Sequence, residues 1–168
     1  MTKFTRYIRR LTAKLVENRD GAVSVIAAVS FTAMVGFVGL GTEASYWYVK
    51  KRNLQGAVDS ASFSAVAAMM NGETWASGTP PAAARAIAAQ YGLVNGAGGV
   101  SVAVNNPPAT GPNAGNANAV EVIITQPQPR LFSALFMSSN PTASARAVAL
   151  QTVSGGNGCI LALDRGKV

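Results

Sequence analysis

A single apolar run dominates the hydrophobic pattern of this chain: residues 21–42, GAVSVIAAVSFTAMVGFVGLGT, contain no charged side chain. As an α-helix rising about 1.5 Å per residue, the run would extend about 33 Å, which exceeds the hydrocarbon core of a bilayer at about 30 Å. A buried helix of a soluble protein is the alternative, but such helices seldom lack both charge and proline over this length. The pattern therefore predicts a transmembrane anchor at residues 21–42 that contacts the lipid bilayer.

The helical period continues beyond this run. Residues 45–71 contain no proline, and an apolar stripe recurs there at spacings of four and three residues. The stripe consists of Leu54, Val58, Ala61, Ala65 and Ala68, and a second, polar face carries Gln55, Asp59 and Ser62. The pattern predicts an amphipathic extension of the anchor over residues 43–72, with a stop at Asn71-Gly72. Small residues permit close packing, either on the same domain, which we favour, or on a neighbouring subunit.

The rest of the chain, residues 73–168, predicts a second helix and a small antiparallel sheet, joined by turn-rich segments. Thr79-Pro80-Pro81 opens the helix, because proline fits a first helical turn. The other expected elements are a strand at 100–104, a mobile Pro/Asn/Gly-rich connection at 105–118, a strand at 119–125, a short apolar helix at 130–137, a strand at 142–152 and an edge strand at 159–163. Segregated helices and strands predict an α+β fold.

Charges on either side of the apolar run predict its orientation. Six basic residues precede the run and three follow it closely, so residues 1–20 are expected to form a cytoplasmic basic tail. Tyr46, Trp47 and Tyr48 follow the run, where aromatic rings settle at headgroup level, and Glu43 is expected in water at the outer interface. No A-x-A site follows the run, which favours an uncleaved signal anchor over a cleaved signal peptide.

Composition excludes several classes of function. The net charge is +7, but residues 53–168 contribute only +1 of it. This distribution argues against nucleic-acid binding. The basic residues that flank the apolar run are instead expected to contact the membrane surface. The chain has no histidine, and the exported carboxylates lie on separate predicted elements. We therefore predict no catalytic, cofactor-binding or metal-binding residues, no cofactor and no enzymatic activity. Glu121 is expected on the solvent face of its strand.

Two further features leave alternatives open. Ser24, Ala28, Thr32 and Gly36 lie four residues apart in the apolar run, which indicates either a surface for helix self-association or the ordinary frequency of small residues in spans. Cys159 is the only thiol. It is a buried inert thiol, half of an intermolecular disulfide, or a thiol whose intramolecular partner is missing. The nearby segment Leu161–Asp164 has the apolar-strand-to-Asp pattern of an integrin-like metal site, but lacks the serines such a site needs.

Several segments together resemble the TadE/TadG-like proteins of Flp/Tad pilus assembly, and the TadG-like members in particular. The segments are RDGAV at 19–23, VGFVGLGTEASYW at 35–47, LQGAVDSASFSAVAA at 54–68, residues 120–148 and CILALD at 159–164. The resemblance implies a single-pass protein of the bacterial inner membrane, with its C-terminal part in the periplasm. It also implies contacts with other pilus-assembly or secretion proteins, and a role in surface attachment.

The chain departs from its relatives in two places. Pseudopilins of the family are cleaved after a glycine and carry glutamate at the fifth mature position, whereas Ile26 is the fifth residue after Gly21. This difference favours an uncleaved anchor over a pseudopilin that enters a filament. TadG-like chains usually continue past the CILALD segment, so an end at Val168 suggests a truncated form. An exported adhesion or metal-binding domain is a further alternative.

Overall fold

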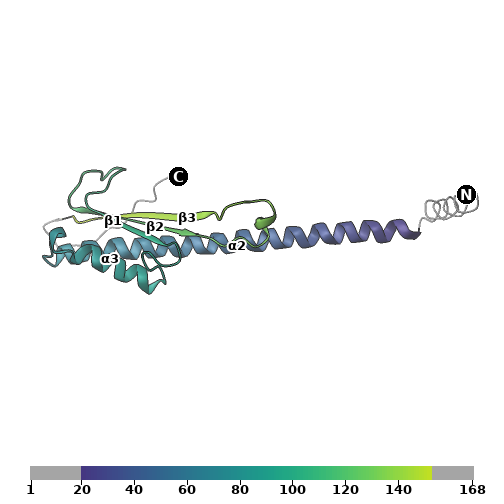
Figure 1. Cartoon of the computed structure of the whole chain (residues 1–168). Coiled ribbons are helices and arrows are strands. Elements are labelled where there is room, and N and C mark those ends of the chain that lie inside the picture. The colour runs from purple at the N-terminus through teal and green to yellow at the C-terminus, as the bar shows by residue number, and fades with distance from the viewer. Residues whose placement is uncertain (1–19, 153–168) are drawn as a thin grey trace, which may run out of the picture. The chain divides into compact units, whose positions relative to one another are not determined.

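The computed structural model describes residues 20–152, which form three strands and two α-helices with two short 3-10 turns (Figure 1). In chain order the elements are α2 (Asp20–Met70), η1 (Trp75–Ser77), α3 (Thr79–Gln90), β1 (Ser101–Asn105), β2 (Ala119–Pro127), η2 (Ser133–Leu135) and β3 (Thr142–Leu150). The chain divides into two compact units, Met1–Glu43 and Ala44–Val168, here called the N-terminal and C-terminal units. The predicted α+β class is confirmed.

The helix α2 ends where the sequence predicts, and α3 ends in the same way. After α2, the backbone N–H of Glu73 donates to Ala68 O at 3.2 Å and that of Gly72 donates to Met69 O at 3.1 Å. This pair of hydrogen bonds, with Gly72 at φ +90°, is a Schellman motif. The same pattern, centred on Gly92, ends α3. Glycine accepts this left-handed conformation without the steric cost that a Cβ atom would add.

The predicted apolar stripe of α2 lies in the core of the C-terminal unit. Leu54, Val58, Ala61 and Ala65 are buried and Ala68 is half-buried. The stripe packs in one cluster with α3 and the inner face of the sheet, so packing on its own domain is confirmed. Ser62, expected on the polar face, is instead buried, because its hydroxyl donates to Asp59 O at 3.0 Å within the helix and no longer requires water.

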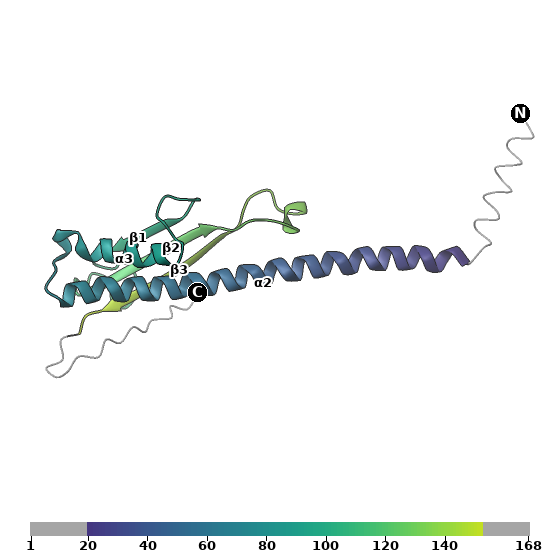
Figure 2. The same ribbon diagram turned by 90° about the horizontal axis from the view of Figure 1, so that it is seen from below.

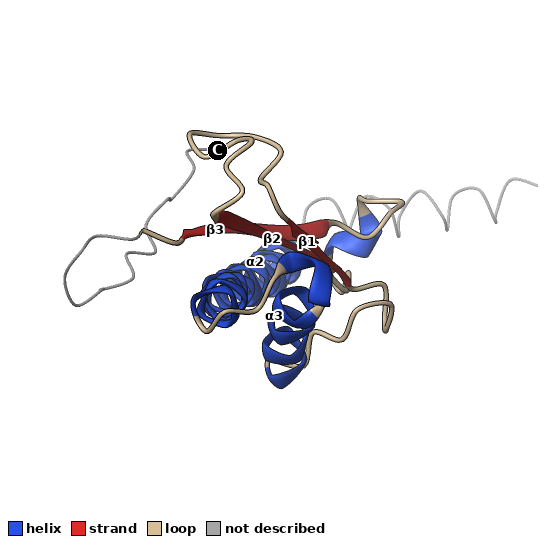
Figure 3. Ribbon diagram, turned by 90° about the vertical axis from the view of Figure 1, so that its left-hand side faces the viewer, coloured by secondary structure: helices blue, strands red, loops and turns tan. Residues whose placement is uncertain are grey.

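The sheet is a three-stranded antiparallel meander of order β1-β2-β3. Val122 pairs with Val104 on one side and Ala147 on the other, and Ile124 pairs with Ala145. These residues share the face that α2 and α3 cover, and Figure 3 shows both helices on that one side. Residues on one face of a strand recur at every second position. On β3 the residues that face the helices are alanines, whose small side chains leave room for the helices.

Two expected elements differ in the structure. The predicted apolar helix at 130–137 is reduced to the 3-10 turn η2, because most of its apolar side chains are exposed and give a helix no face to bury. The expected mobile connection at 105–118 is tied down by hydrogen bonds, including two from Asn106 Nδ2 to Ala117 O at 2.7 Å and Ala119 O at 2.8 Å. The predicted edge strand at 159–163 lies outside the described residues.

Candidate functional site

The first part of α2 has the surface of a helix that crosses a membrane. It is long and apolar enough for a span, and 6% of its most apolar window is buried in the protein. A core helix of a soluble protein would be mostly buried, whereas Val29 and Phe37 are exposed. These large apolar side chains would meet water unless lipid or another protein covers them. The predicted anchor at residues 21–42 therefore falls on a helix of the expected length and exposure.

Three hydroxyl groups in the apolar run are satisfied within the helix. Ser24 donates to Gly21 O at 2.8 Å, and the Thr32 and Thr42 hydroxyls donate to the carbonyls four residues earlier, each at 2.9 Å. A hydroxyl that donates to its own helix costs less in hydrocarbon than one without a partner. These three hydroxyl groups therefore add less to the cost of a span than hydroxyl groups without partners would. Self-association through its small residues stays a prediction.

An aromatic and basic segment follows the run. Trp47 Nε1 donates to the Pro129 carbonyl at 3.1 Å, and Lys50 Nζ lies 5.5 Å from the centre of the Tyr46 ring. An indole with one apolar body and one satisfied N–H suits the headgroup region of a bilayer. Glu43, expected in water at this level, is instead 3% exposed. Its carboxylate has an interaction partner, which is the condition under which a carboxylate can be buried.

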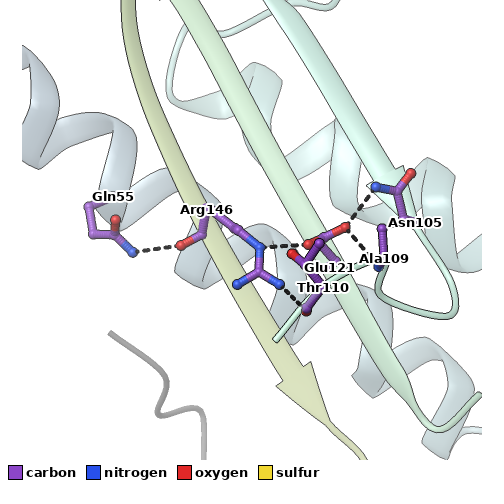
Figure 4. A network of polar contacts seen from close by, with 6 residues as sticks. All are labelled: Gln55, Asn105, Ala109, Thr110, Glu121 and Arg146. Carbon is purple, nitrogen blue, oxygen red and sulfur yellow. Dashed lines mark hydrogen bonds and ion pairs between the residues drawn. The ribbon is translucent and has the colours of Figure 1, made fainter. Parts of the chain in front are cut away.

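The main polar cluster of the C-terminal unit is centred on Glu121 in β2 (Figure 4). Arg146 Nε on β3 donates to Glu121 Oε1 at 2.6 Å. The other oxygen, Oε2, accepts from Asn105 Nδ2 at 2.9 Å and from the Ala109 backbone N–H at 3.4 Å. Arg146 also donates through Nη2 to Thr110 O at 2.6 Å. These five residues, here called the Glu121 cluster, join all three strands to the β1–β2 connection.

The expected solvent exposure of Glu121 is wrong. Its neighbours Val120 and Val122 face the helices, so Glu121 does lie on the opposite face of the sheet. There, however, the β1–β2 connection covers it, and 1% of the side chain is exposed. Burial raises the pKa of Glu121, but the hydrogen bonds from Asn105, Arg146 and Ala109, together with the charge of Arg146, outweigh burial and lower the pKa below its usual value.

The geometry of the Glu121 cluster suits a structural role rather than a catalytic one. Both carboxylate oxygens already accept hydrogen bonds, and a lowered pKa keeps the group ionised rather than ready to donate a proton. A general acid or base needs the opposite: a raised pKa and a free oxygen that faces a substrate. Gln55 of α2 extends the cluster, since its Nε2 donates to Arg146 O at 3.4 Å and to Asp59 Oδ1 at 2.9 Å.

A shallow, open hollow of about 590 Å³ lies on the outer surface of α2 and α3. It is lined by Asp59, Ser60, Phe63, Ser64, Ala67 and Ile87. Phe63 is exposed and Ile87 is half-buried, so the surface is apolar with a polar rim from Asp59 and the serines. A surface of this kind suits contact with another protein more than capture of a small ligand, which needs enclosure.

The remaining sequence predictions about sites fall partly outside residues 20–152. Within those residues, no group of three or more Asp, Glu, Cys or His side chains is placed to hold a metal ion. Cys159 and the segment Leu161–Asp164 lie outside the described residues. The prediction of no catalytic or cofactor-binding residues stays a prediction. The Glu121 cluster was missed at the sequence level, because its ion pair joins residues 25 positions apart.

Comparisons with known proteins identify one segment. No curated protein and no solved structure matches this chain. A family model, described as "Putative Flp pilus-assembly TadE/G-like", matches residues 21–68. The match covers the apolar run and the buried stripe of α2, and includes neither α3 nor the sheet. The resemblance to the TadE/TadG-like family is confirmed for this part of the chain: residues 21–68 carry a Flp pilus-assembly TadE/G-like segment.

Proposed function

We propose that this protein is a single-pass, TadG-like component of a Flp/Tad-type pilus-assembly or secretion apparatus, and that it acts through protein contacts without enzymatic activity. The observation that carries the proposal is the overlap of the family match at 21–68 with a helix long and apolar enough to cross a membrane. In this proposal residues 21–42 form the anchor in the bacterial inner membrane, residues 43–72 extend the anchor helix, and residues 73–168 form a periplasmic domain.

The charge distribution supports an N-terminus in the cytoplasm. Six basic residues lie before the apolar run and three lie within ten residues after it. Positively charged segments are retained on the cytoplasmic side during insertion, so the larger group sets the orientation. The second group, Lys50, Lys51 and Arg52, can then contact anionic headgroups on the opposite side.

The described surface supports a role in protein contacts. The hollow around Phe63 and Ile87 offers an apolar contact area with a polar rim. The Glu121 cluster supplies rigidity rather than chemistry, because its carboxylate is buried and fully hydrogen-bonded. A stiff domain with an apolar surface, carried on a membrane helix, suits a subunit that positions other assembly proteins. The small residues of the span add a surface for self-association in the bilayer.

Membrane fractionation and thiol accessibility test the anchor and its orientation. In a Cys159→Ser background, Thr2→Cys and Ala114→Cys place one thiol in each flank of the span. We expect the protein in the membrane pellet after an alkaline wash. A membrane-impermeant maleimide should label Ala114→Cys in intact spheroplasts and Thr2→Cys only after lysis. A soluble product, or the reverse labelling, would contradict the proposal.

The runner-up function is a cleaved pseudopilin that enters a pilus filament. Gly21 offers a cleavage position, but Ile26 replaces the glutamate that pseudopilins carry there. That carboxylate normally meets the free N-terminus of a neighbouring subunit, and an isoleucine cannot. Intact-mass measurement of the protein from membranes decides between the two. An uncut N-terminus supports the anchor, whereas an N-terminus at Ala22 supports the pseudopilin.

A further inference from the structure

The connection between β2 and β3 exposes a compact apolar surface. Leu135 is 83% exposed and Phe136 is 78% exposed, and Leu131 and Phe132 are also exposed. These four residues are here called the apolar loop. Burial of large apolar side chains is favourable, so four exposed ones within six residues of one connection indicate something that covers them.

The apolar loop has a defined shape. Arg130 Nε donates to Asn140 Oδ1 at 2.7 Å, and the same guanidinium donates to the Met137 carbonyl. The backbone N–H groups of Phe136 and Met137 donate to Ser133 O at 2.9 and 2.8 Å. Ser133 is buried, while the apolar side chains on both sides of it are exposed. The backbone therefore presents these side chains outward on a fixed turn, which lowers the entropy cost of inserting them into another phase.

The loop begins beside the part of α2 that follows the apolar run. Trp47 Nε1 donates to Pro129 O at 3.1 Å, two residues before Leu131. Trp47 is five residues beyond Thr42. Five residues span at most about 18 Å even when fully extended and about 8 Å as a helix, so chain connectivity keeps Trp47 within about 18 Å of the end of the proposed span.

Within the C-terminal unit, the sheet carries the loop toward the lower-numbered end of this unit's part of α2. Gln55 of α2 contacts Arg146 in β3, and Trp47, eight residues earlier in α2, contacts Pro129 beyond the end of β2. Contacts thus move toward lower residue numbers of α2 as β2 approaches the apolar loop. Figures 1 and 2 both show the β2–β3 connection at this end of the sheet, opposite to the β1–β2 connection.

The local charge is also complementary to a bilayer. Residues 128–141 contain no acidic side chain, and Arg130 lies at the base of the loop. Lys50, Lys51 and Arg52 lie one turn beyond Trp47 on α2. Anionic lipid surfaces attract such basic groups. An apolar tip with a basic base suits shallow insertion into the headgroup region.

From these relations we propose that the apolar loop inserts into the outer headgroup region of the bilayer that residues 21–42 cross. It forms a second, peripheral membrane contact that fixes the C-terminal unit against the lipid surface. This inference rests on the proposed membrane anchoring. In this proposal lipid covers the apolar loop. The following experiment distinguishes lipid from a partner protein on the same surface.

The test uses the full chain with Cys159→Ser, reconstituted in vesicles of phosphatidylcholine with a minority of phosphatidylglycerol. An environment-sensitive fluorophore is attached to Leu135→Cys, to Ala114→Cys as a matched exposed position in the β1–β2 connection, or to Val29→Cys in the span. Lipids with a nitroxide near the headgroup serve as quenchers for positions 135 and 114, and lipids with a nitroxide along the acyl chain serve as quenchers for position 29. We expect a blue-shifted emission at position 135 and several-fold stronger quenching there than at position 114.

The outcomes separate the two proposals. Strong acyl-depth quenching at position 29 without quenching at 135 would overturn the loop insertion and leave the anchor intact. An unquenched label at position 29 would overturn the anchor itself. A blue shift at 135 that appears without lipid quenching would show that protein, such as a second copy of this chain, covers the loop, and would also overturn the lipid contact.

Discussion

Arg146 Nε lies 2.6 Å from Glu121 Oε1, and the two partners differ sharply in exposure: 30% of the arginine side chain is accessible, against 1% of the glutamate. The pair is therefore not symmetric. Without Glu121, the guanidinium can turn to water and keep its bond to Thr110 O. Without Arg146, the carboxylate stays buried with only Asn105 and Ala109 as donors. The cost of an unpaired buried charge therefore arises when Arg146 is removed, and not when Glu121 is removed.

The first prediction follows from this asymmetry. Arg146→Met should destabilise the protein more than Glu121→Gln, by about 2–3 against about 1–2 kcal/mol, because only the first variant strands a buried anion. Chemical denaturation of the full chain in detergent micelles, followed by circular dichroism, measures both. Arg85→Met, on an exposed position of α3, is the matched control and should change stability by less than about 0.5 kcal/mol. Equal losses for the two cluster variants would contradict the asymmetry.

The pKa of Glu121 gives a second prediction, for acid stability. Its pKa in the folded protein lies below the value of about 4.3 expected for an unfolded chain, so ionised Glu121 stabilises the fold. This contribution is fully present above the unfolded pKa and is lost as the pH falls through the lower, folded pKa. The gap in melting temperature between the native protein and Glu121→Gln should thus be constant at neutral pH and shrink in acid. A gap that widened in acid would reverse the sign of the pKa shift.

The core position of the α2 stripe gives a third prediction. Ala61 is fully buried in the core cluster, so Ala61→Leu adds three carbons inside a packed core. Overpacking of this kind costs about 1–3 kcal/mol. Ala86→Leu makes the same chemical change on an exposed position of α3 and should be nearly neutral. Both variants are measured by the same denaturation; similar stabilities would argue that the stripe does not carry the contact.

The end of α2 and its apolar stripe could be predicted from the sequence, because both depend on residues that are neighbours in the chain. The stop of α2 at Gly72 and the stripe from Leu54 to Ala65 follow from backbone sterics and helical period, which a sequence displays directly. The burial of Glu121 could not be predicted in this way. It depends on Arg146 in another strand and on a connection whose composition gave no sign that it folds over the sheet.

For Glu121 the sequence predicted exposure where the structure shows burial. For the apolar loop the sequence predicted a helix where the structure shows an exposed turn. The segment RLFSALFM at 130–137, which contains the apolar loop, is predicted from its sequence to form a short apolar helix. In the structure α2 and α3 cover the inner face of the sheet, and Leu131, Leu135 and Phe136 are exposed outside this core. A sequence pattern reports that side chains are apolar, but it does not report which phase will cover them.

A fourth prediction concerns the close approach of Gly99 to Pro127 at the end of β2. Gly99 has φ +77°, and a Cβ atom there would lie 2.8 Å from Pro127 Cγ. Gly115 has nearly the same backbone angle, φ +75°, with nothing within 4 Å of its Cβ position. Gly115→Ala should therefore cost only the left-handed backbone strain of about 1–2 kcal/mol, while Gly99→Ala adds a clash with a rigid ring. Denaturation midpoints of the two full-length variants measure the difference directly. Because Pro127 leads into the apolar loop, Gly99→Ala should also weaken lipid quenching at position 135, whereas equal stability of the two variants would show that the ring moves aside freely.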